Sequence, residues 1–352
     1  MTVSDIISRL EPGYEFLGPL TVKRKLPLAQ GDKADARIEV GWGDAPDIYS
    51  FVVDAKVQST PLVVQSAIAQ VKTMVKGDEH PMIMVPYLSP ERLNDLKQAQ
   101  VSGVDLCGNG IVMLPGRLLV ACSGSPNEYP ESRPLNNPYR GRSAMVARML
   151  LTSGCQWWPS LKELLTSIRK AGADLSLSQA SKAVQAMEDD LIIIKNGGTI
   201  KLQEPMLLFD KLGAEWRKPQ IRGRQAVRLP SGIDFARVLS ANQLLKWAVT
   251  GASSVKRYAM FTQGGPMQIA VSSLPLALTL LNGRPESVPN FADMELIEAD
   301  EAGYYFDNKM DENGVRWANR LQAWLELQSG DARQQEAARD IKTQILKDVS
   351  LL

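Results

Sequence analysis

The sequence contains a single histidine, His80, and three cysteines, Cys107, Cys122 and Cys155. One histidine excludes a histidine-rich metal site, and a Ser-His-Asp triad would have to use a residue in the turn-like stretch Gly77–Pro81. The cysteines form no CxxC pair, and their odd number excludes a complete disulfide framework. Cysteine usage of this kind is typical of a reducing compartment, so we expect a cytoplasmic protein.

The sequence also lacks long hydrophobic runs. No window approaches the ~20 uninterrupted apolar residues that a membrane-spanning helix needs. The N-terminal stretch Met1–Leu10 includes Asp5 and Arg9 and no continuous apolar region, so it does not have the pattern of a signal peptide. We therefore expect no membrane partner.

The chain has the composition of a globular protein. Of its 352 residues, 44% are hydrophobic and 22% are charged, which excludes wholesale disorder and a collagen-like fold. Domains contain about 100–200 residues, so two or three are expected. Two proline-punctuated polar stretches, 123–139 and 216–230, have the composition of linkers. They predict domains at residues 1–125, 138–215 and 230–352.

Charge is distributed unevenly along the chain, although 40 basic and 39 acidic side chains give a formal net charge of +1. Residues 139–228 contain 15 basic and 8 acidic side chains, a net charge of +7. Residues 1–138 contain 13 basic and 16 acidic side chains, and residues 229–352 contain 12 and 15. The near-neutral total therefore arises because the acidic excess of the two outer segments cancels most of the basic excess of the middle one. The middle segment is the one expected to bind nucleic acid.

The middle segment begins with the pattern of two helices. Residues 143–151 form a short apolar run, and Ser160 with Glu163 three residues later is a capping-box pattern that opens the next helix. Leucine and isoleucine then recur at i, i+3, i+4 and i+7, which places them on one face. Gly172 is expected to end this helix.

A third helix and a hairpin follow. Ser176 with Gln179 is another capping-box pattern, and an apolar stripe runs from Ala180 to Leu191. A β-branched run, the turn Asn196-Gly197-Gly198 and a second strand-like run predict a hairpin. This order resembles winged helix-turn-helix regulators, in which the third helix enters the major groove. Its expected outward side chains are Gln179, Ser181, Lys182, Gln185 and Ala186.

The resemblance implies that this segment binds double-stranded DNA. Short polar side chains and a lysine suit base edges and phosphates, and flanking cations would make the affinity depend on salt. The residues expected to contact DNA are Arg140, Arg142, Gln179, Ser181, Lys182, Gln185, Lys195, Lys201, Arg222 and Arg224, and Arg217 and Lys218 could add phosphate contacts. The alternative is a winged helix that binds a protein. Its lysines and arginines would then interact with water and not with DNA.

The N-terminal segment has the pattern of an α/β sheet. Strand-like runs come first and then alternate with helix-like runs, among them a helix over Ser89–Gln100. The predicted strands are Leu20–Leu28, Ala36–Val40, Ile48–Val57, Met82–Val85 and Val104–Leu106.

Two carboxylates and a lysine lie at the ends of neighbouring predicted strands. Asp54 and Lys56 close the third strand, and Asp35 precedes the second. The arrangement resembles the PD-(D/E)xK restriction-endonuclease-like fold. The resemblance implies that Asp35 and Asp54 hold Mg²⁺ and that Lys56 positions the attacking water, which makes these three residues catalytic. Gln65 or Gln70 would be the polar residue on the following helix.

This sequence departs from the family pattern, because no Pro-Asp dipeptide occurs at Asp35, and Pro46-Asp47 lies too close to Asp54 to take its place. An Asp–Lys pair is also a common structural ion pair at strand ends. An inactive nuclease-like scaffold, which makes DNA or protein contacts, is therefore preferred over an active nuclease.

The C-terminal segment has the pattern of an α/β domain that ends in helices. A helix is expected at Ala241–Val249, strands at Met267–Val271 and Met294–Ile297, and helices at Trp317–Leu327 and Asp331–Leu346. No Asp-x-Asp follows Gly251-Ala252-Ser253 at a distance that would suit a nucleotidyltransferase. We interpret the segment as non-catalytic. Its acidic balance and its two C-terminal helices, which are expected to be exposed, suit contact with a partner protein.

Two parts of the chain resemble AbiEi-type antitoxins of type IV toxin–antitoxin systems. One is Ser102–Gly110, in which Gly108-Asn109-Gly110 suits a tight turn between strands and Asp105 suits a turn-capping role. The other combines TGASS at 250–254 with LQAWLEL at 321–327 and GDARQQEAARDI at 330–341.

The predicted fold class is α/β and α+β multidomain, with a PD-(D/E)xK nuclease-like sheet, a central winged helix-turn-helix and a C-terminal α/β domain. The resemblance implies a DNA-binding transcriptional regulator, an AbiEi-like antitoxin or autorepressor that needs no cofactor and whose protein partner is a nucleotidyltransferase toxin. The alternative is a Mg²⁺-dependent nuclease that the winged helix targets to DNA, and a third interpretation is a structural adaptor. DNA-binding proteins of this type often bind two half-sites as a dimer, so the sequence is compatible with a homodimer and with a monomer.

Overall fold

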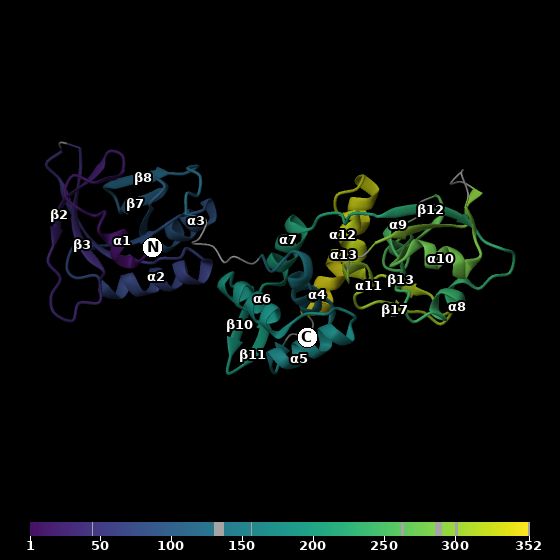
Figure 1. The fold of residues 1–352 in the computed structure, drawn as a ribbon. Coiled ribbons are helices and arrows are strands. Elements are labelled where there is room, and N and C mark those ends of the chain that lie inside the picture. Colours follow the sequence, from purple (N-terminus) through teal and green to yellow (C-terminus); the bar gives the residue numbers. More distant parts are fainter. Residues whose placement is uncertain are drawn as a thin grey trace. The chain divides into compact units, whose positions relative to one another are not determined.

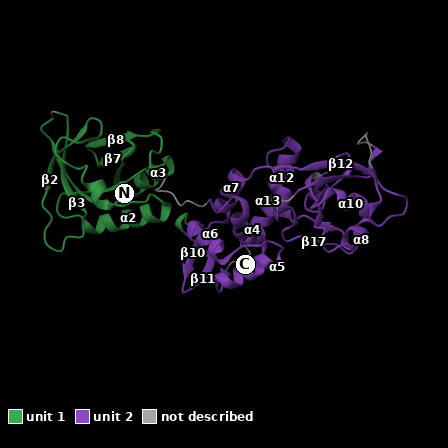
Figure 2. Ribbon diagram, viewed as in Figure 1, with its two compact units in different colours: residues 1–135, 189–191 green, residues 136–188, 192–352 purple. Residues whose placement is uncertain are grey.

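The computed structural model describes residues 1–43, 45–129, 137–155, 157–261, 264–285, 291–299 and 302–350. Figure 1 shows a mixed α/β protein with its strands gathered into three sheets. The chain forms two compact units, drawn in different colours in Figure 2: residues 1–135 with 189–191, and residues 136–188 with 192–352. Among the described residues, no helix has both the length and the hydrophobicity needed to span a membrane.

The first unit is built on an eight-stranded mixed sheet whose strands follow the chain order across it. The pairs β4–β5 and β5–β6 are parallel, and the other neighbouring pairs are antiparallel. The strands are β1 (Glu15–Leu17), β2 (Leu20–Leu26), β3 (Ala36–Trp42), β4 (Ile48–Ala55), β5 (His80–Val85), β6 (Ser102–Asp105), β7 (Gly110–Leu114) and β8 (Leu118–Cys122).

Helices cover this sheet because its central strands are apolar on both faces, as is typical of parallel pairing. α2 (Pro61–Met74) packs Val64, Ala67 and Val71 against one face. α1 (Val3–Ile7) contributes Ile6 to the core on the other face. α3 (Pro90–Ala99) begins at Ser89, whose hydroxyl accepts a hydrogen bond from the Arg92 backbone N–H. The five predicted strands correspond to β2, β3, β4, β5 and β6, with ends that differ by at most two residues.

The helices and the hairpin of the central segment, which we define as residues 137–215, occur in the predicted order. The β10–β11 turn requires glycine, since Gly197 and Gly198 have φ of +56° and +91°. The elements are η2 (Gly141–Ser143), α4 (Ala144–Thr152), β9 (Trp157–Trp158), α5 (Leu161–Lys170), α6 (Leu177–Asp189), β10 (Ile193–Asn196), β11 (Thr199–Leu202) and α7 (Pro205–Glu215). The three strands form a small antiparallel sheet in the order β10–β11–β9.

The core of the central segment is shared with the C-terminal helices α12 (Arg320–Leu327) and α13 (Ala332–Ser350). Leu321, Trp324 and Ile341 belong to the same buried cluster as the apolar faces of α4 to α7. The rings of Phe209 and Trp324 meet edge to face, with their centroids 4.9 Å apart.

A seven-stranded mixed sheet completes the second unit, in the order β15–β12–β16–β14–β13–β18–β17. Its strands are β12 (Gly223–Arg228), β13 (Trp247–Val249), β14 (Met267–Val271), β15 (Arg284–Pro285), β16 (Met294–Glu298), β17 (Lys309–Met310) and β18 (Arg316–Trp317). The helices between them are α8 (Phe235–Ser240), α9 (Gly251–Val255), α10 (Leu274–Leu281) and α11 (Ala302–Tyr305).

Five expectations are corrected by the structure. The two C-terminal helices expected to be exposed are α12 and α13, and both bury side chains in the shared core because they pack on the central segment. The basic stretch predicted as a linker contains β12, because residues 223–227 pair with Glu298 to Met294 of β16. The helix expected over Ala241–Val249 is absent from the described residues, where α8 ends at Ser240 and Trp247–Val249 form a strand. Ala186, expected to face outward, is buried. The third helix ends at Asp189, since Leu191 adopts φ of +61° and cannot continue it.

Candidate functional site

α6 separates its side chains cleanly into a buried and an exposed face. Ala180, Ala183, Val184 and Met187 are buried in the core that the central segment shares with α12 and α13. The opposite face exposes five polar side chains at helical spacing, which are Ser178, Gln179, Ser181, Lys182 and Gln185. This exposed face combines small hydroxyl and amide groups with one cation.

Two glutamines of this face are already engaged within the protein. The Gln179 side-chain oxygen accepts a hydrogen bond from the Ser176 backbone N–H at 3.1 Å, and the Ser176 hydroxyl accepts one from the Gln179 N–H at 3.2 Å. This reciprocal capping box satisfies two helix-end donors. The Gln185 side-chain oxygen accepts a hydrogen bond from Lys195 Nζ at 2.6 Å.

Lys195 connects the hairpin to α6. Its Nζ also forms an ion pair with Glu188 at 2.6 Å, so one cation of β10 is bound to two side chains of the helix. Lys201, on the neighbouring strand β11, is exposed. Of the two hairpin cations predicted to contact DNA, Lys195 therefore fixes the hairpin against α6 and Lys201 projects into solvent.

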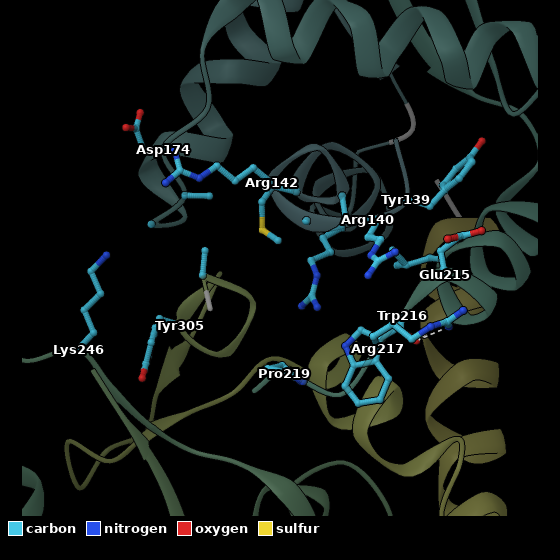
Figure 3. Close-up of a pocket in the computed structure, with 18 of the residues that line it drawn as sticks. Tyr139, Arg140, Arg142, Asp174, Glu215, Trp216, Arg217, Pro219, Lys246 and Tyr305 are labelled. Atoms are coloured by element: carbon cyan, nitrogen blue, oxygen red, sulfur yellow. Dashed lines mark hydrogen bonds between the residues drawn. The ribbon is translucent and has the colours of Figure 1, made fainter. Parts of the chain in front are cut away.

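The remaining predicted DNA contacts lie elsewhere in the second unit. Arg140 and Arg142 are exposed residues next to and within η2, and both line a pocket described below (Figure 3). Arg222 precedes β12, and Arg224 belongs to it and pairs with Glu295 at 3.1 Å. Arg224 is thus part of the seven-stranded sheet, and Arg222 adjoins it and donates its backbone N–H to the Glu298 carbonyl at 3.0 Å. Neither lies in a linker beside the hairpin, because the sheet starts earlier than expected.

The first unit brings Asp35, Asp54 and Lys56 together at the end of β4. The β3–β4 register pairs Ala36 with Val53, which sets Asp35 opposite Asp54. The Asp35 Oδ2 atom accepts a hydrogen bond from the Ala55 backbone N–H at 2.7 Å. Lys56 Nζ donates to Asp54 Oδ1 at 2.7 Å. The sequence predicted this proximity correctly, since it follows from strand pairing.

Asp54 is the unusual member of this group. It is only 2% exposed, and its Oδ2 atom has no hydrogen-bond partner among the described residues. Burial raises the pKa of the Asp54 carboxyl, Lys56 opposes that effect, and the neighbouring Asp35 carboxyl raises the pKa further. An orphaned buried oxygen beside a second carboxylate fits the hard-oxygen preference of Mg²⁺, and Asp35 and Asp54 are the residues that would hold it.

Other parts of the predicted nuclease site are missing or differ. Gln65 and Gln70 are both exposed, whereas α2 buries Val64, Ala67 and Val71. Among the described residues, no group of three or more histidine, cysteine, aspartate or glutamate side chains is arranged to hold a metal. Any ion would therefore rely on water and substrate for most of its ligands.

Asp105 has a structural role, as its position before a glycine-containing turn suggested. Its Oδ1 atom accepts hydrogen bonds from the backbone N–H groups of Cys107 and Asn109, at 2.8 and 2.7 Å. Its Oδ2 atom accepts from the Leu88 N–H and the Asn109 side-chain amide, both at 2.8 Å. With four donors around it, this buried carboxylate has no oxygen left for a ligand.

Sequence reasoning missed the basic pocket in the second unit. Its cations come from several distant stretches of the chain, including Arg140, Lys218 and Lys246. Only the overall basic excess of the middle segment hinted at it.

The chain was compared with models of protein families, with curated proteins and with solved structures, and no match was found. Function is therefore argued from the residues and their geometry.

Proposed function

We propose that this protein is a double-stranded-DNA-binding regulator whose central segment is a winged helix, with α6 as the reading helix and β10–β11 as the wing. The observation that supports the proposal is the exposed face of α6, which presents Ser178, Ser181 and Lys182 beside the hairpin cation Lys201. Side chains of this size and polarity suit base edges, and the lysines suit phosphates.

The roles of the predicted contacts differ within this proposal. Lys182 and Lys201 are exposed and make no ion pair with a described residue, so they are available to phosphates. Lys195 holds the wing against α6 through Glu188 and Gln185. Gln179 contributes chiefly to the helix cap. Hydrogen bonds to the base edges would then come from Ser178 and Ser181. Gln185 could add one after its side chain rotates away from Lys195.

The test is a DNA titration by fluorescence anisotropy over a range of salt concentrations. A Lys182→Ala/Lys201→Ala variant is expected to lose about tenfold or more in affinity and to reduce the salt slope by about 2. The matched control is Lys162→Ala/Lys170→Ala, which removes the same charge from exposed positions on α5. Equal losses in the two variants, or no salt slope in the wild type, would contradict the proposal.

The AbiEi resemblance extends this proposal to an antitoxin or autorepressor that acts with a nucleotidyltransferase toxin. The acidic C-terminal segment, with 12 basic and 15 acidic side chains, is the proposed contact for that partner. A neighbouring nucleotidyltransferase gene whose product co-purifies with this chain would support the extension. Absence of such a gene would remove the antitoxin role and leave DNA binding to be judged by the titration.

A Mg²⁺-dependent nuclease is the second candidate, and the orphaned Asp54 Oδ2 atom beside Asp35 favours it. When bound, Mg²⁺ would supply Lewis-acid stabilisation of the scissile phosphate. Asp35 and Asp54 would hold the ion, and Lys56 would place its positive charge beside the phosphate or the attacking water. Asp54 keeps Lys56 in place through the 2.7 Å contact between them.

Incubation of plasmid, linear and single-stranded DNA with Mg²⁺ or Mn²⁺ tests this second candidate. Metal-dependent cleavage that disappears in Lys56→Ala and Asp54→Asn but persists in Asp47→Asn would establish it. Asp47 is a suitable control because it is an exposed aspartate that immediately precedes β4 and lies outside the group. Cleavage that survives in Lys56→Ala would assign the activity to a contaminant.

A further inference from the structure

A pocket of about 580 Å³ lies within the second unit, where the central segment meets the seven-stranded sheet (Figure 3). Its walls come from η2 and α4, from the turn between α5 and α6, from the end of α7 and from the residues before β13. α11 closes it with Ala302 and Tyr305. Its volume falls within the ~300–1,000 Å³ typical of small-molecule sites.

The pocket is strongly basic. Six of its lining side chains are cationic and two are anionic. The cations are Arg140, Arg142, Arg148, Arg217, Lys218 and Lys246, and the anions are Asp174 and Glu215. Such an excess of one sign in a concave surface attracts an anion.

Two of these cations serve the protein itself. Arg148 is buried and donates to Gln322 Oε1 at 2.8 Å. Arg217 donates to the Ala214 and Trp216 carbonyls, at 2.7 and 2.9 Å, and so caps the end of α7.

The other four cations, Arg140, Arg142, Lys218 and Lys246, are exposed and form no ion pair with any described residue. They come from three separate stretches of the chain, so the fold, not a local charge run, gathers them at one pocket. A ligand with several negative charges is the chemistry that this arrangement matches.

The pocket also offers apolar and aromatic surface. Met145, Leu212 and Leu244 line it together with Trp216 and Tyr305. The Trp216 Nε1 atom is buried and has no hydrogen-bond partner within the described residues. Apolar walls with a few convergent polar groups are typical of sites for small organic molecules.

We propose that this pocket binds a nucleoside polyphosphate. The phosphates would meet the four uncommitted cations, and the planar base would lie against the aromatic and apolar wall. A DNA duplex is a poorer match, since its phosphates lie on a convex surface that cannot fill a pocket with an apolar wall. Three of these cations, Arg140, Arg142 and Lys218, are also candidates for phosphate contacts with DNA, whereas Lys246 is not. The competition experiment below therefore has to separate the two ligands.

The test is isothermal titration calorimetry of the full-length protein with ATP, inorganic triphosphate and adenosine as probes. We expect ATP to bind most tightly, triphosphate more weakly and adenosine weakest. Lys218→Gln/Lys246→Gln should lose about tenfold or more in ATP affinity, since each lysine supplies a charge-assisted contact. Both side chains are exposed, so the melting temperature should stay unchanged and should confirm that the variant is folded. Lys162→Gln/Lys170→Gln removes the same charge from α5 and should bind ATP like the wild type.

Absence of saturable binding by ATP and triphosphate would overturn the proposal, as would equal ATP affinity in the pocket variant and the wild type. A DNA duplex added as a competitor separates the pocket from the DNA interface. Displacement of ATP by the duplex, with the same loss of duplex and ATP affinity in Lys218→Gln/Lys246→Gln, would assign the pocket to DNA and not to a nucleotide.

Discussion

Asp105 illustrates how one buried carboxylate can organise a turn between strands. It accepts four hydrogen bonds from Leu88, Cys107 and Asn109, with two at each oxygen. In Asp105→Asn, an NH2 group replaces one of the two carboxylate oxygens. In either orientation of the side chain, this NH2 group faces two donors and cannot accept a hydrogen bond from them. We expect a loss of about 3 kcal/mol in the free energy of unfolding, measured by urea denaturation. Asp78→Asn, at an exposed site before β5, should change it by less than about 0.5 kcal/mol.

Tyr258 should make stability depend on alkaline pH. Burial raises the pKa of its phenol to about 12, and its hydroxyl donates to the Ala318 carbonyl at 2.7 Å. The unfolded phenol ionises near pH 10, whereas the folded one stays neutral, so its stabilising contribution is complete below pH 10 and is lost as the pH rises to about 12.

Comparison with Tyr258→Phe isolates this effect from that of other titrating groups. The stability advantage of the wild type over the variant should shrink by about 2 kcal/mol between pH 10 and 12, as measured by urea denaturation at each pH. A constant difference over that range would show that the folded phenol ionises like the unfolded one.

The sequence predicted which side chains lie close together for some of the candidate site residues and not for others. Asp35, Asp54 and Lys56 lie at the ends of adjacent strands, and strand pairing alone brings them together. The engagement of Lys195 with Glu188 depends on how the hairpin packs against α6, which no local pattern encodes. The orphaned Asp54 oxygen and the basic pocket likewise depend on tertiary structure.

At the scale of elements, the apolar stripe of α5 should contribute far more to stability than an exposed leucine on the helix after it. Leu164 is 0% exposed in the shared core, whereas Leu177 at the start of α6 is 55% exposed. Leu164→Ala should therefore cost about 3 kcal/mol, because it removes buried surface and leaves a cavity. Leu177→Ala, the same chemical change, should cost less than about 0.5 kcal/mol. Thermal denaturation of the two variants measures the contrast, and similar losses would contradict the assigned burial.

Elements with strong periodicity or turn chemistry were predicted from the sequence, and short elements set by pairing were not. α5, α6 and the Asn196–Gly198 hairpin follow from capping boxes, apolar spacing and glycine. Trp247–Val249 lies in a run that favours a helix, yet pairing with Ile269–Val271 makes it a strand. β12 was missed because its arginines and glutamine resemble linker composition, while its pairing with β16 lies far away in sequence.

At the scale of the whole molecule, the segment that contains the basic excess is not the same as the set of segments that form its hydrophobic core. The basic excess belongs to residues 139–228, but the core of the central segment extends to α12 and α13. Three contacts illustrate this. Phe209 packs on Trp324, Arg148 donates to Gln322, and Lys342 pairs with Asp210 at 2.7 Å. A DNA-binding surface on the central segment would thus be supported by helices more than a hundred residues later in the chain.

This shared core leads to a prediction about which fragments fold. A fragment of residues 137–215 contains every element of the proposed winged helix but lacks Leu321, Trp324, Ile341 and Ile345, which are buried in its core. Removing these side chains exposes apolar surface, at about 25 cal/mol per Å², on α4 and α7 in a fragment of a size that is only marginally stable. We expect a broad, non-cooperative thermal transition for residues 137–215, measured by circular dichroism, and a cooperative one for residues 137–350. A cooperative transition in the short fragment would show that the central segment is a self-sufficient domain and that α12 and α13 merely rest on it.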